Sequence, residues 1–337
     1  MPKGFAVIGV GTWGQLHAEV YASHPEAQLV AVCDADGEKA HAIARRYGCK
    51  ACTDIAEITQ DRSVDAVSVA TPDFAHTKPS LAVLSAGKHL LVEKPLATTV
   101  PDAKRIAEAA RTSGLKVMVD FHNRWNPLFY QVKESFRRGE LGKPVHLYIR
   151  HSNTTAVPRQ MLGWSRQSSV AWFLGSHSVD LARWLVGAEV ERVYTVSRNM
   201  WLKKLGVDSP DFFVTTLEFT GGAVALVENS WMLPESMPTA GNFEAEVVGT
   251  GGCAFVDFTM HRAVDIYHNR HILPDVLAGY EQYGKTAGFT VESIKHFIEC
   301  VVCDRYPVVT VEDGLAVTKI ISAALESAKR GAPVNLS

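Results

Sequence analysis

A glycine-rich loop between a short apolar run and an amphipathic run constrains this chain more than any other feature. The apolar run Phe5-Ala6-Val7-Ile8 leads into Gly9-Val10-Gly11-Thr12-Trp13-Gly14, and helical periodicity follows from Gln15. A strand that enters a helix through G-x-G-x-x-G is typical of a parallel α/β domain, where the helix N-terminus offers free N–H groups to a phosphate. The loop therefore predicts a doubly wound sheet with a phosphate site above the first strand.

The glycines and a following acidic residue indicate which phosphate compound the loop binds. Gly9 permits the tight turn, Gly11 lets the backbone approach a pyrophosphate, and Gly14 allows close packing of helix and strand. Asp34 follows Gly14 by twenty residues, after a second apolar run, and its carboxylate can accept hydrogen bonds from a ribose diol. Because Asp34 repels a 2′-phosphate and Ala35 supplies no arginine, we expect NAD to be preferred over NADP.

Composition excludes several classes of protein. The chain has 337 residues, 47% of them hydrophobic, which predicts about two globular domains. A net charge of −2 gives no general attraction to nucleic acid or to an anionic membrane, and no apolar run reaches the ~18 residues of a membrane helix. The six cysteines include two C-x-x-C pairs without further ligands nearby, so we expect core thiols, no metal site and a reducing cytoplasm.

The first ~120 residues alternate short, β-branched apolar runs with amphipathic runs. The pattern predicts a parallel sheet whose ligand lies outside the carboxyl ends of the strands. Expected strands are 4–9, 28–34, 51–53, 64–70, 89–93 and 116–119, and expected helices are 13–23, 37–47, about 76–86 and 101–113.

After Asn126-Pro127 the pattern changes to that of an α+β domain with a large, open, mostly antiparallel sheet. Glycine pairs at 221–222 and 251–252 lie where hairpin turns belong. We expect an NAD-binding Rossmann domain at 1–121, an α+β substrate-binding and oligomerisation domain at 122–311, and a last helix, 312–330, that can pack back on the first domain. Expected strands are about 144–153, 190–200, 211–219, 223–232, 242–250, 253–258 and 263–267, and expected helices are about 127–138, 176–187 and 290–303.

The later strands carry apolar residues on both faces, among them Val224, Leu226 and Val227. A sheet with two apolar faces needs cover on both. We therefore expect a homodimer or homotetramer formed through this sheet.

Lys94 is the first candidate for chemistry. It lies between Glu93 and Pro95 at the end of an expected buried strand, where the nicotinamide of a bound dinucleotide should lie. A half-buried lysine beside a carboxylate can hold a substrate hydroxyl and adjust its proton affinity.

Several segments together resemble the glucose–fructose oxidoreductase / inositol dehydrogenase / MocA (Gfo/Idh/MocA) family, and the resemblance covers nearly the whole chain. It implies NAD(P)-dependent oxidation or reduction at a secondary carbinol of a sugar, sugar derivative or cyclitol, and oligomers built through the open sheet. The segments that carry it are Gly9–Gly14, Asp34, 71–76, 86–95, 124–127, 175–180 and 312–314.

His177 is the second candidate, and the resemblance assigns it the role of base toward the reacting hydroxyl. Asp180, three residues on, shares its helix face and resembles a position that binds substrate hydroxyls. Many family members carry an aspartate four residues before this histidine, but here the residue is Phe173. The lysine–aspartate–histidine trio that the resemblance implies is thus reduced to Lys94 and His177. This departure keeps a non-catalytic sugar- and NAD-sensing protein open as an alternative.

The remaining candidates bind rather than react. Trp164, Trp172 and Phe173 mildly favour another alternative, a diol dehydrogenase with a more apolar substrate. Predicted cofactor contacts are Gly9, Gly11, Thr12, Trp13, Gly14, Asp34, Thr71, Pro72, His76, Glu93, Lys94 and Asn123, and predicted substrate contacts are Lys94, Asn153, Trp164, Trp172, Phe173, His177 and Asp180.

Overall fold

The computed structural model describes residues 2–259, 263–269 and 271–336, which form two compact units. The first unit runs to His122 and includes Gly279–Thr318, and the second comprises Asn123–Ala278 with the chain from Lys319 onward. The sequence-based boundaries had placed 122–311 in the second domain. The difference arises because the helix that begins at Phe289 packs against the first helix of the chain. Phe297 of that helix also lies edge-on to Phe5 of the first strand, at 6.2 Å between ring centroids.

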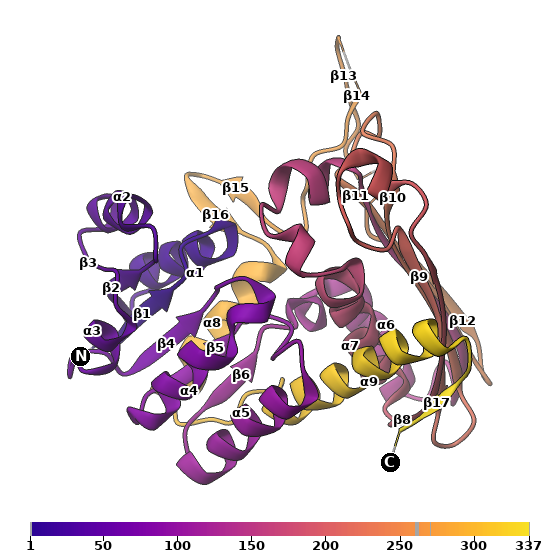
Figure 1. The fold of residues 1–337 in the computed structure, drawn as a ribbon, viewed down its shortest axis with the longest axis horizontal. Coiled ribbons are helices and arrows are strands. Elements are labelled where there is room, and N and C mark those ends of the chain that lie inside the picture. The colour runs from indigo at the N-terminus through magenta and orange to yellow at the C-terminus, as the bar shows by residue number, and fades with distance from the viewer. Residues whose placement is uncertain (1, 260–262, 270, 337) are drawn as a thin grey trace. The chain divides into compact units, whose positions relative to one another are not determined.

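The first unit is built on a six-stranded parallel sheet in the order β3-β2-β1-β4-β5-β6, which confirms the predicted doubly wound architecture (Figure 1). Consecutive strands run outward from β1 in one direction and from β4 in the other, so the carboxyl ends of β1 and β4 flank a topological switch point. The strands are β1 Lys3–Ile8, β2 Ala27–Cys33, β3 Lys50–Cys52, β4 Ala66–Val69, β5 His89–Val92 and β6 Val117–Val119.

Two helices of this unit, α2 and α5, begin and end at residues that satisfy or accommodate their terminal backbone. Asp36 and Thr99 accept N-terminal N–H groups of α2 and α5, and Gly48 and Gly114 close the same helices in the left-handed conformation. A short hairpin of β15 and β16, which the sequence pattern did not predict, precedes α8. The bounds are α1 Thr12–Ser23, α2 Gly37–Tyr47, α3 Ile55–Thr59, η1 Asp73–Ala75, α4 Thr77–Ser85, α5 Val100–Ser113, η2 His122–Trp125, β15 Tyr280–Gln282, β16 Lys285–Ala287, α8 Phe289–Val302 and α9 Val311–Arg330. Of these, η2 from Asn123 and α9 from Lys319 belong to the second unit.

The second unit is built on a seven-stranded sheet in the order β12-β11-β7-β10-β9-β8-β17. Among its described strands only β7 and β10 pair in parallel, so the mostly antiparallel sheet is confirmed. Gly221 and Gly222 make the predicted turn between β9 and β10, both with positive φ. The strands are β7 Pro144–Thr154, β8 Val190–Arg198, β9 Phe212–Phe219, β10 Val224–Leu233, β11 Gly241–Gly249, β12 Cys253–Asp257 and β17 Val334–Asn335.

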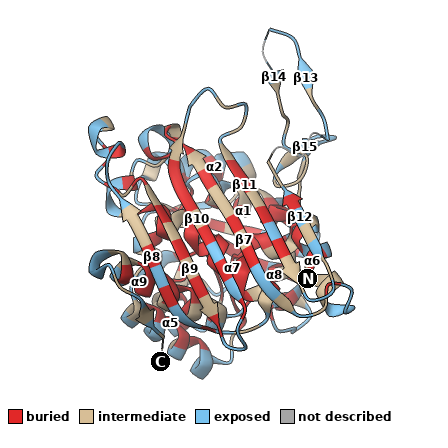
Figure 2. Ribbon diagram, turned by 90° about the vertical axis from the view of Figure 1, so that its right-hand side faces the viewer, coloured by how far each residue is buried: buried red, intermediate tan, exposed pale blue. Residues whose placement is uncertain are grey.

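One face of this sheet is packed and the other is open (Figure 2). Leu147, Ile149, Ala225 and Val227 point to the packed face and are at most 2% exposed. The covering elements include α6 Pro127–Arg137, η5 Ala171–Gly175 and α7 Ser176–Val186. The short helices η3 Val157–Met161, η4 Ser165–Gln167 and η6 Leu202–Leu205 and the hairpin of β13 Ile266–Tyr267 and β14 His271–Ile272 lie in connections. The strand expected at 263–267 is limited to β13 at its end, and residues 260–262 fall outside the described ranges.

Two further expectations concern the whole chain. Within the described residues, no helix combines the length and apolarity needed to cross a bilayer. Of the four cysteines in the C-x-x-C pairs, Cys52 and Cys300 are buried as expected of core thiols and Cys49 is partly buried, whereas Cys303 is exposed, so the core interpretation is wrong for Cys303.

Candidate functional site

The glycine-rich loop has the geometry that a pyrophosphate requires. Gly9 has φ +89°, and a Cβ on it would lie 2.7 Å from the Ala70 carbonyl carbon. A Cβ on Gly14 would lie 1.8 Å from the Gly9 oxygen, so only glycine fits there. A Cβ on Gly11, by contrast, would meet no atom within 4 Å. The loop is therefore closed toward the sheet and open above Gly11, in front of the first N–H groups of α1, where a phosphate can bind.

Asp34 lies at the end of β2 and is fixed by the same loop. Its Oδ2 accepts from the Val10 N–H at 2.8 Å, and its Oδ1 accepts from the Asp36 N–H at 2.9 Å. The carboxylate is only partly buried, and each oxygen retains a second lone pair. It can therefore accept hydrogen bonds from a ribose diol, and the Gly11 cradle together with Asp34 fits an NAD molecule.

Other predicted cofactor contacts lie along the same edge of the sheet. Thr12 is exposed, and Trp13 stacks on His122 with 5.1 Å between ring centroids. Thr71 and Pro72, which follow β4, are partly exposed.

His76 connects two of the predicted cofactor loops. Its Nδ1 lies 2.7 Å from the Pro95 carbonyl oxygen, its Nε2 lies 2.9 Å from that of Thr71, and the residue is 1% exposed. Both ring nitrogens therefore face backbone carbonyls. This geometry indicates that His76 holds the two loops together and favours an indirect role over the direct cofactor contact that we expected.

Lys94 is buried at the carboxyl end of β5. Lys94 is 7% exposed, and its backbone N–H donates to Oε2 of Glu93 at 3.2 Å. Burial lowers the pKa of Lys94, while the negative charges of Glu93, Asp73 and Asp120 oppose that shift. An ammonium group in such surroundings is a strong hydrogen-bond donor whose proton is easier to release than that of a surface lysine.

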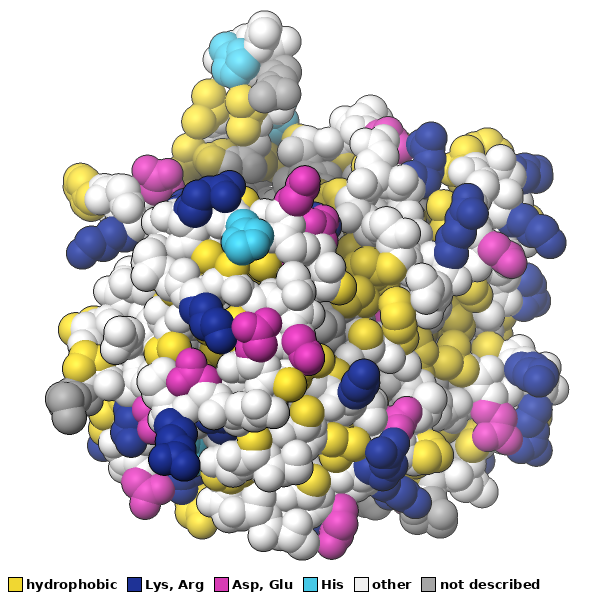
Figure 3. Space-filling view, turned by 60° about the vertical axis from the view of Figure 1, so that its left-hand side comes forward, with side chains coloured by type: hydrophobic (Ala, Val, Ile, Leu, Met, Phe, Trp, Pro, Cys, Tyr) yellow, Lys and Arg dark blue, Asp and Glu magenta, His cyan; other side chains and the backbone are white. Residues whose placement is uncertain are grey.

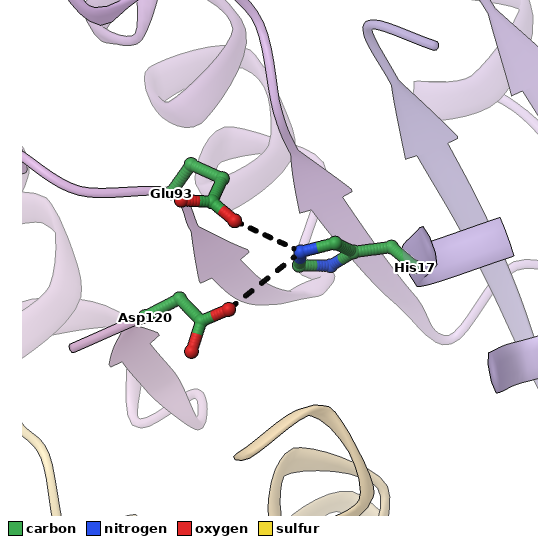
Figure 4. A group of neighbouring side chains, drawn as sticks. All are labelled: His17, Glu93 and Asp120. Carbon is green, nitrogen blue, oxygen red and sulfur yellow. Dashed lines mark hydrogen bonds and ion pairs between the residues drawn. The ribbon is translucent and has the colours of Figure 1, made fainter. Parts of the chain in front are cut away.

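Two residues that the sequence analysis did not single out complete the surroundings of Glu93 (Figure 4). His17 Nε2 lies 3.1 Å from Oε1 of Glu93 and 3.6 Å from Oδ2 of Asp120. Burial opposes ionisation of Glu93, but the hydrogen bond and positive charge of His17 outweigh it and hold the pKa of Glu93 below its usual value. The sequence did contain a signal, because Asp120 directly follows β6 at the ligand edge and His17 lies on the helix that the glycine loop begins.

In the second unit, His177 is the second residue of α7 and is 5% exposed. Its ring lies beside that of His151 on β7, with 5.8 Å between centroids, and His151 stacks on Phe243 at 4.1 Å. The sequence analysis did not single out His151. The packing of α7 against β7 therefore places the ring of His177 beside that of His151.

Asp180 has a partner that its spacing from His177 did not reveal. Its carboxylate accepts two hydrogen bonds from Arg124, Nε to Oδ2 at 2.9 Å and Nη2 to Oδ1 at 2.6 Å. Both side chains are at least nine-tenths buried. This bidentate ion pair indicates that Asp180 joins α7 to the segment containing Asn123, which is itself buried, and it makes the predicted direct contact with substrate less favourable.

The aromatic candidates form one cluster. The Phe173 ring lies 6.1 Å from Trp164 and 6.1 Å from Trp231, centroid to centroid. Phe173 and Trp164 are partly exposed, whereas Trp172 is 7% exposed and belongs to the core. Asn153, at the end of β7, is partly exposed and donates to the Ala240 carbonyl at 3.4 Å.

Two family models match the chain in succession. Residues 3–121 match the model of an oxidoreductase family with an NAD-binding Rossmann fold (GFO_IDH_MocA), and residues 129–255 match the GFO/IDH/MocA C-terminal domain. The two models thus cover the first sheet and most of the second.

Relatives of known name match over nearly the full length. The chain is 30% identical over 336 residues to scyllo-inositol 2-dehydrogenase (NAD(+)) of Bacillus subtilis, covering 98% of this chain and 95% of that protein. It is 28% identical to myo-inositol 2-dehydrogenase of Thermotoga maritima, covering 98% and 97%. Among solved structures, GenD2 from gentamicin A biosynthesis in complex with NAD is 26% identical and superposes with a TM-score of 0.86, over 100% of this chain and 97% of that one.

Proposed function

Because the chain belongs to the GFO/IDH/MocA family of oxidoreductases, we propose that it transfers a hydride between NAD and a secondary alcohol or ketone carbon of a cyclitol, sugar or sugar derivative. The observation that carries this proposal is Lys94, a buried lysine beside a carboxylate at the same sheet edge as the Gly11 cradle. Relatives named as inositol 2-dehydrogenases support a cyclitol as the first substrate to test.

The proposed roles follow from the chemistry of carbinol oxidation. Bound at the loop 9–14, NAD supplies the hydride acceptor. Lys94 donates a hydrogen bond to the substrate oxygen, which stabilises negative charge that develops there. His177 accepts the hydroxyl proton as the carbonyl forms. In the reverse direction the same histidine returns the proton to the oxygen.

The cluster of Trp164, Phe173 and Trp231 supports a refinement of the substrate class. The half-buried Phe173 stands where many family members carry the aspartate of the catalytic trio, so a carboxylate there is replaced by an apolar surface. A polyol with one apolar ring face, or a less polar diol, fits that change better than a substrate that is polar on every side.

A substrate panel tests the proposed function. We expect NADH formation with one or more of myo-inositol, scyllo-inositol, cyclic sugars and apolar vicinal diols. With the best substrate, NAD should exceed NADP by ~10-fold or more in kcat/KM because of the Asp34 carboxylate. Saturable binding of NAD and a polyol without any turnover would identify a sensor and refute the dehydrogenase. A kcat/KM that favours NADP would refute the role of Asp34.

We also propose that the protein is a homodimer or homotetramer whose contact is the open face of the second unit's sheet. Pairing of the strands places Phe255, Tyr148, Leu226 and Tyr194 in one row across this face, together with Glu246 and Thr216. Phe255 is 73% exposed and Leu226 is 38% exposed in the single chain. Association would remove these apolar side chains from water.

Light scattering at micromolar concentration checks the assembly. We expect the mass of two or four chains for the native protein and a shift toward one chain for Leu226→Glu, which places a charge in the middle of the row. Tyr306→Glu is the matched control, because Tyr306 is 82% exposed but lies in the first unit. A monomeric native protein, or equal dissociation by both variants, would contradict this interface.

A further inference from the structure

Three ionisable side chains of the first unit converge beneath the end of β5. His17 projects from α1, Glu93 follows β5 and Asp120 follows β6, and their side chains point toward one another (Figure 4). The side chains are 0%, 5% and 2% exposed. The nitrogen of His17 and one oxygen of each acid all lie within 4.8 Å of one another, and that nitrogen is 3.1 Å from Oε1 of Glu93 and 3.6 Å from Oδ2 of Asp120, so it lies between the two acids.

The number of protons in this cluster is restricted by its geometry. The other nitrogen of His17, Nδ1, lies 2.9 Å from Oγ of Ser68, which in turn lies 2.5 Å from the Tyr21 hydroxyl. Nε2 carries at most one hydrogen, so His17 can donate only one hydrogen toward the two carboxylates that face it. Two such carboxylates cannot both ionise without a large electrostatic cost in a water-excluded site.

Charge favours Asp120 as the residue that takes the additional proton. Burial, and then the negative charge of Glu93, raise the pKa of Asp120 to about 7. Oδ1 of Asp120 is buried and makes no hydrogen bond within the described structure, so this oxygen gains little from ionisation. Glu93, by contrast, is held by His17 and by the backbone N–H of Lys94.

Lys94 is connected to this cluster through Glu93. Glu93 connects the two, because one oxygen faces His17 and the other accepts from the Lys94 backbone. Burial of His122 lowers its pKa to about 4, so it is neutral near pH 7 and leaves the charge balance to the acids, His17 and Lys94. The polar and charged groups that face the cluster come from α1 (His17, Tyr21), β4 (Ser68), the end of β5 (Glu93, Lys94), η1 (Asp73), the end of β6 (Asp120, His122) and α8 (Ser293).

We propose that His17, Glu93 and Asp120 share one mobile proton beneath Lys94, and that this proton controls the charge of Lys94. Asp120 and His17 are then positioning residues for the proposed hydride transfer, on which this role rests. They exchange no atom with the substrate. When Asp120 releases its proton at higher pH, its negative charge stabilises the Lys94 ammonium and keeps it a hydrogen-bond donor.

Infrared spectroscopy of the full chain without substrate detects the proton directly. We expect a band of a buried protonated carboxyl group that disappears as pH rises through about 7, and that is missing from Asp120→Asn. Asp304→Asn is the matched control, because Asp304 is an exposed acid of the same unit and asparagine tolerates its positive φ. In His17→Gln the band should persist to higher pH, because the positive charge of His17 favours ionisation of Asp120.

The pH profile of kcat/KM provides the second readout. In Asp120→Asn the Asp120 carboxylate no longer supports the Lys94 ammonium and only Glu93 and Asp73 remain, so the alkaline limb should move to lower pH by on the order of one unit, with unchanged NAD affinity. The proposal is overturned if the carboxyl band is absent from the native protein or unchanged in Asp120→Asn, or if a divalent cation copurifies and is lost in that variant. A protein that oxidises no polyol would refute the proposed function, while the infrared titration would still decide whether the proton is shared.

Discussion

Replacing Lys94 by methionine is expected to abolish most turnover while leaving the protein folded. Methionine fills a similar volume in this buried position but donates no hydrogen bond to the substrate oxygen. Loss of a group that acts on the reacting oxygen lowers kcat by ~10²–10⁴-fold. We expect steady-state kinetics to show this loss in kcat, with NAD affinity measured by fluorescence close to that of the native protein.

Lys88→Met is the matched control for this prediction. Lys88 is also buried and lies just before β5, but its ammonium donates to the carbonyl oxygens of Asp61 at 2.7 Å and Val64 at 2.8 Å, away from the carboxyl edge of the sheet. Its replacement leaves two buried carbonyls without that donor, so we expect a lower thermal midpoint and near-native kcat. Equal losses of kcat in the two variants would indicate a general effect of buried lysines on folding and would remove the basis for the role of Lys94.

The first sheet could be predicted in detail because its information is local. Each strand is a short apolar run, each turn carries glycine or an acid, and Gly9 to Gly14 identify the strand at the switch point. The placement of Gly279–Thr318 could not be predicted in the same way. An amphipathic helix shows that it needs an apolar partner, but the contact of Phe297 with Phe5 joins opposite ends of the chain.

The candidate site shows the same limit. Lys94 and Asp34 were identified because each follows a strand at the ligand edge, a property that the sequence pattern displays. Asp180 was expected to bind substrate because it resembles a substrate-binding position of the family and shares a helix face with His177, but Arg124, 56 residues away, donates hydrogen bonds to both of its oxygens. The pairing of His17 with Asp120 likewise depends on how α1 crosses the sheet, which spacing along one chain does not specify.

His177 gives the second large expected effect. His177→Ala should lower kcat by ~10²–10⁴-fold while leaving NAD binding intact, because the hydroxyl proton loses its acceptor. The residue lies at the start of α7, 5% exposed and beside the ring of His151. Since Phe173 supplies no carboxylate four residues earlier, and Asp180 is held by Arg124, a different environment from that of the usual family trio has to support this histidine.

Phe173→Ala separates proton transfer from substrate contact in the same segment. Phenylalanine transfers no proton, so its removal from the cluster with Trp164 and Trp231 should raise KM or change the preferred substrate while kcat falls little. The assay is a comparison of kcat and KM for both variants with the best substrate of the panel. Near-native turnover in His177→Ala would show that another group accepts the proton. A large loss of kcat in Phe173→Ala would show that Phe173 helps to position the reacting groups and does more than contact the substrate. If His177→Ala alone loses turnover, the chain works with a lysine and a histidine where many relatives use three groups.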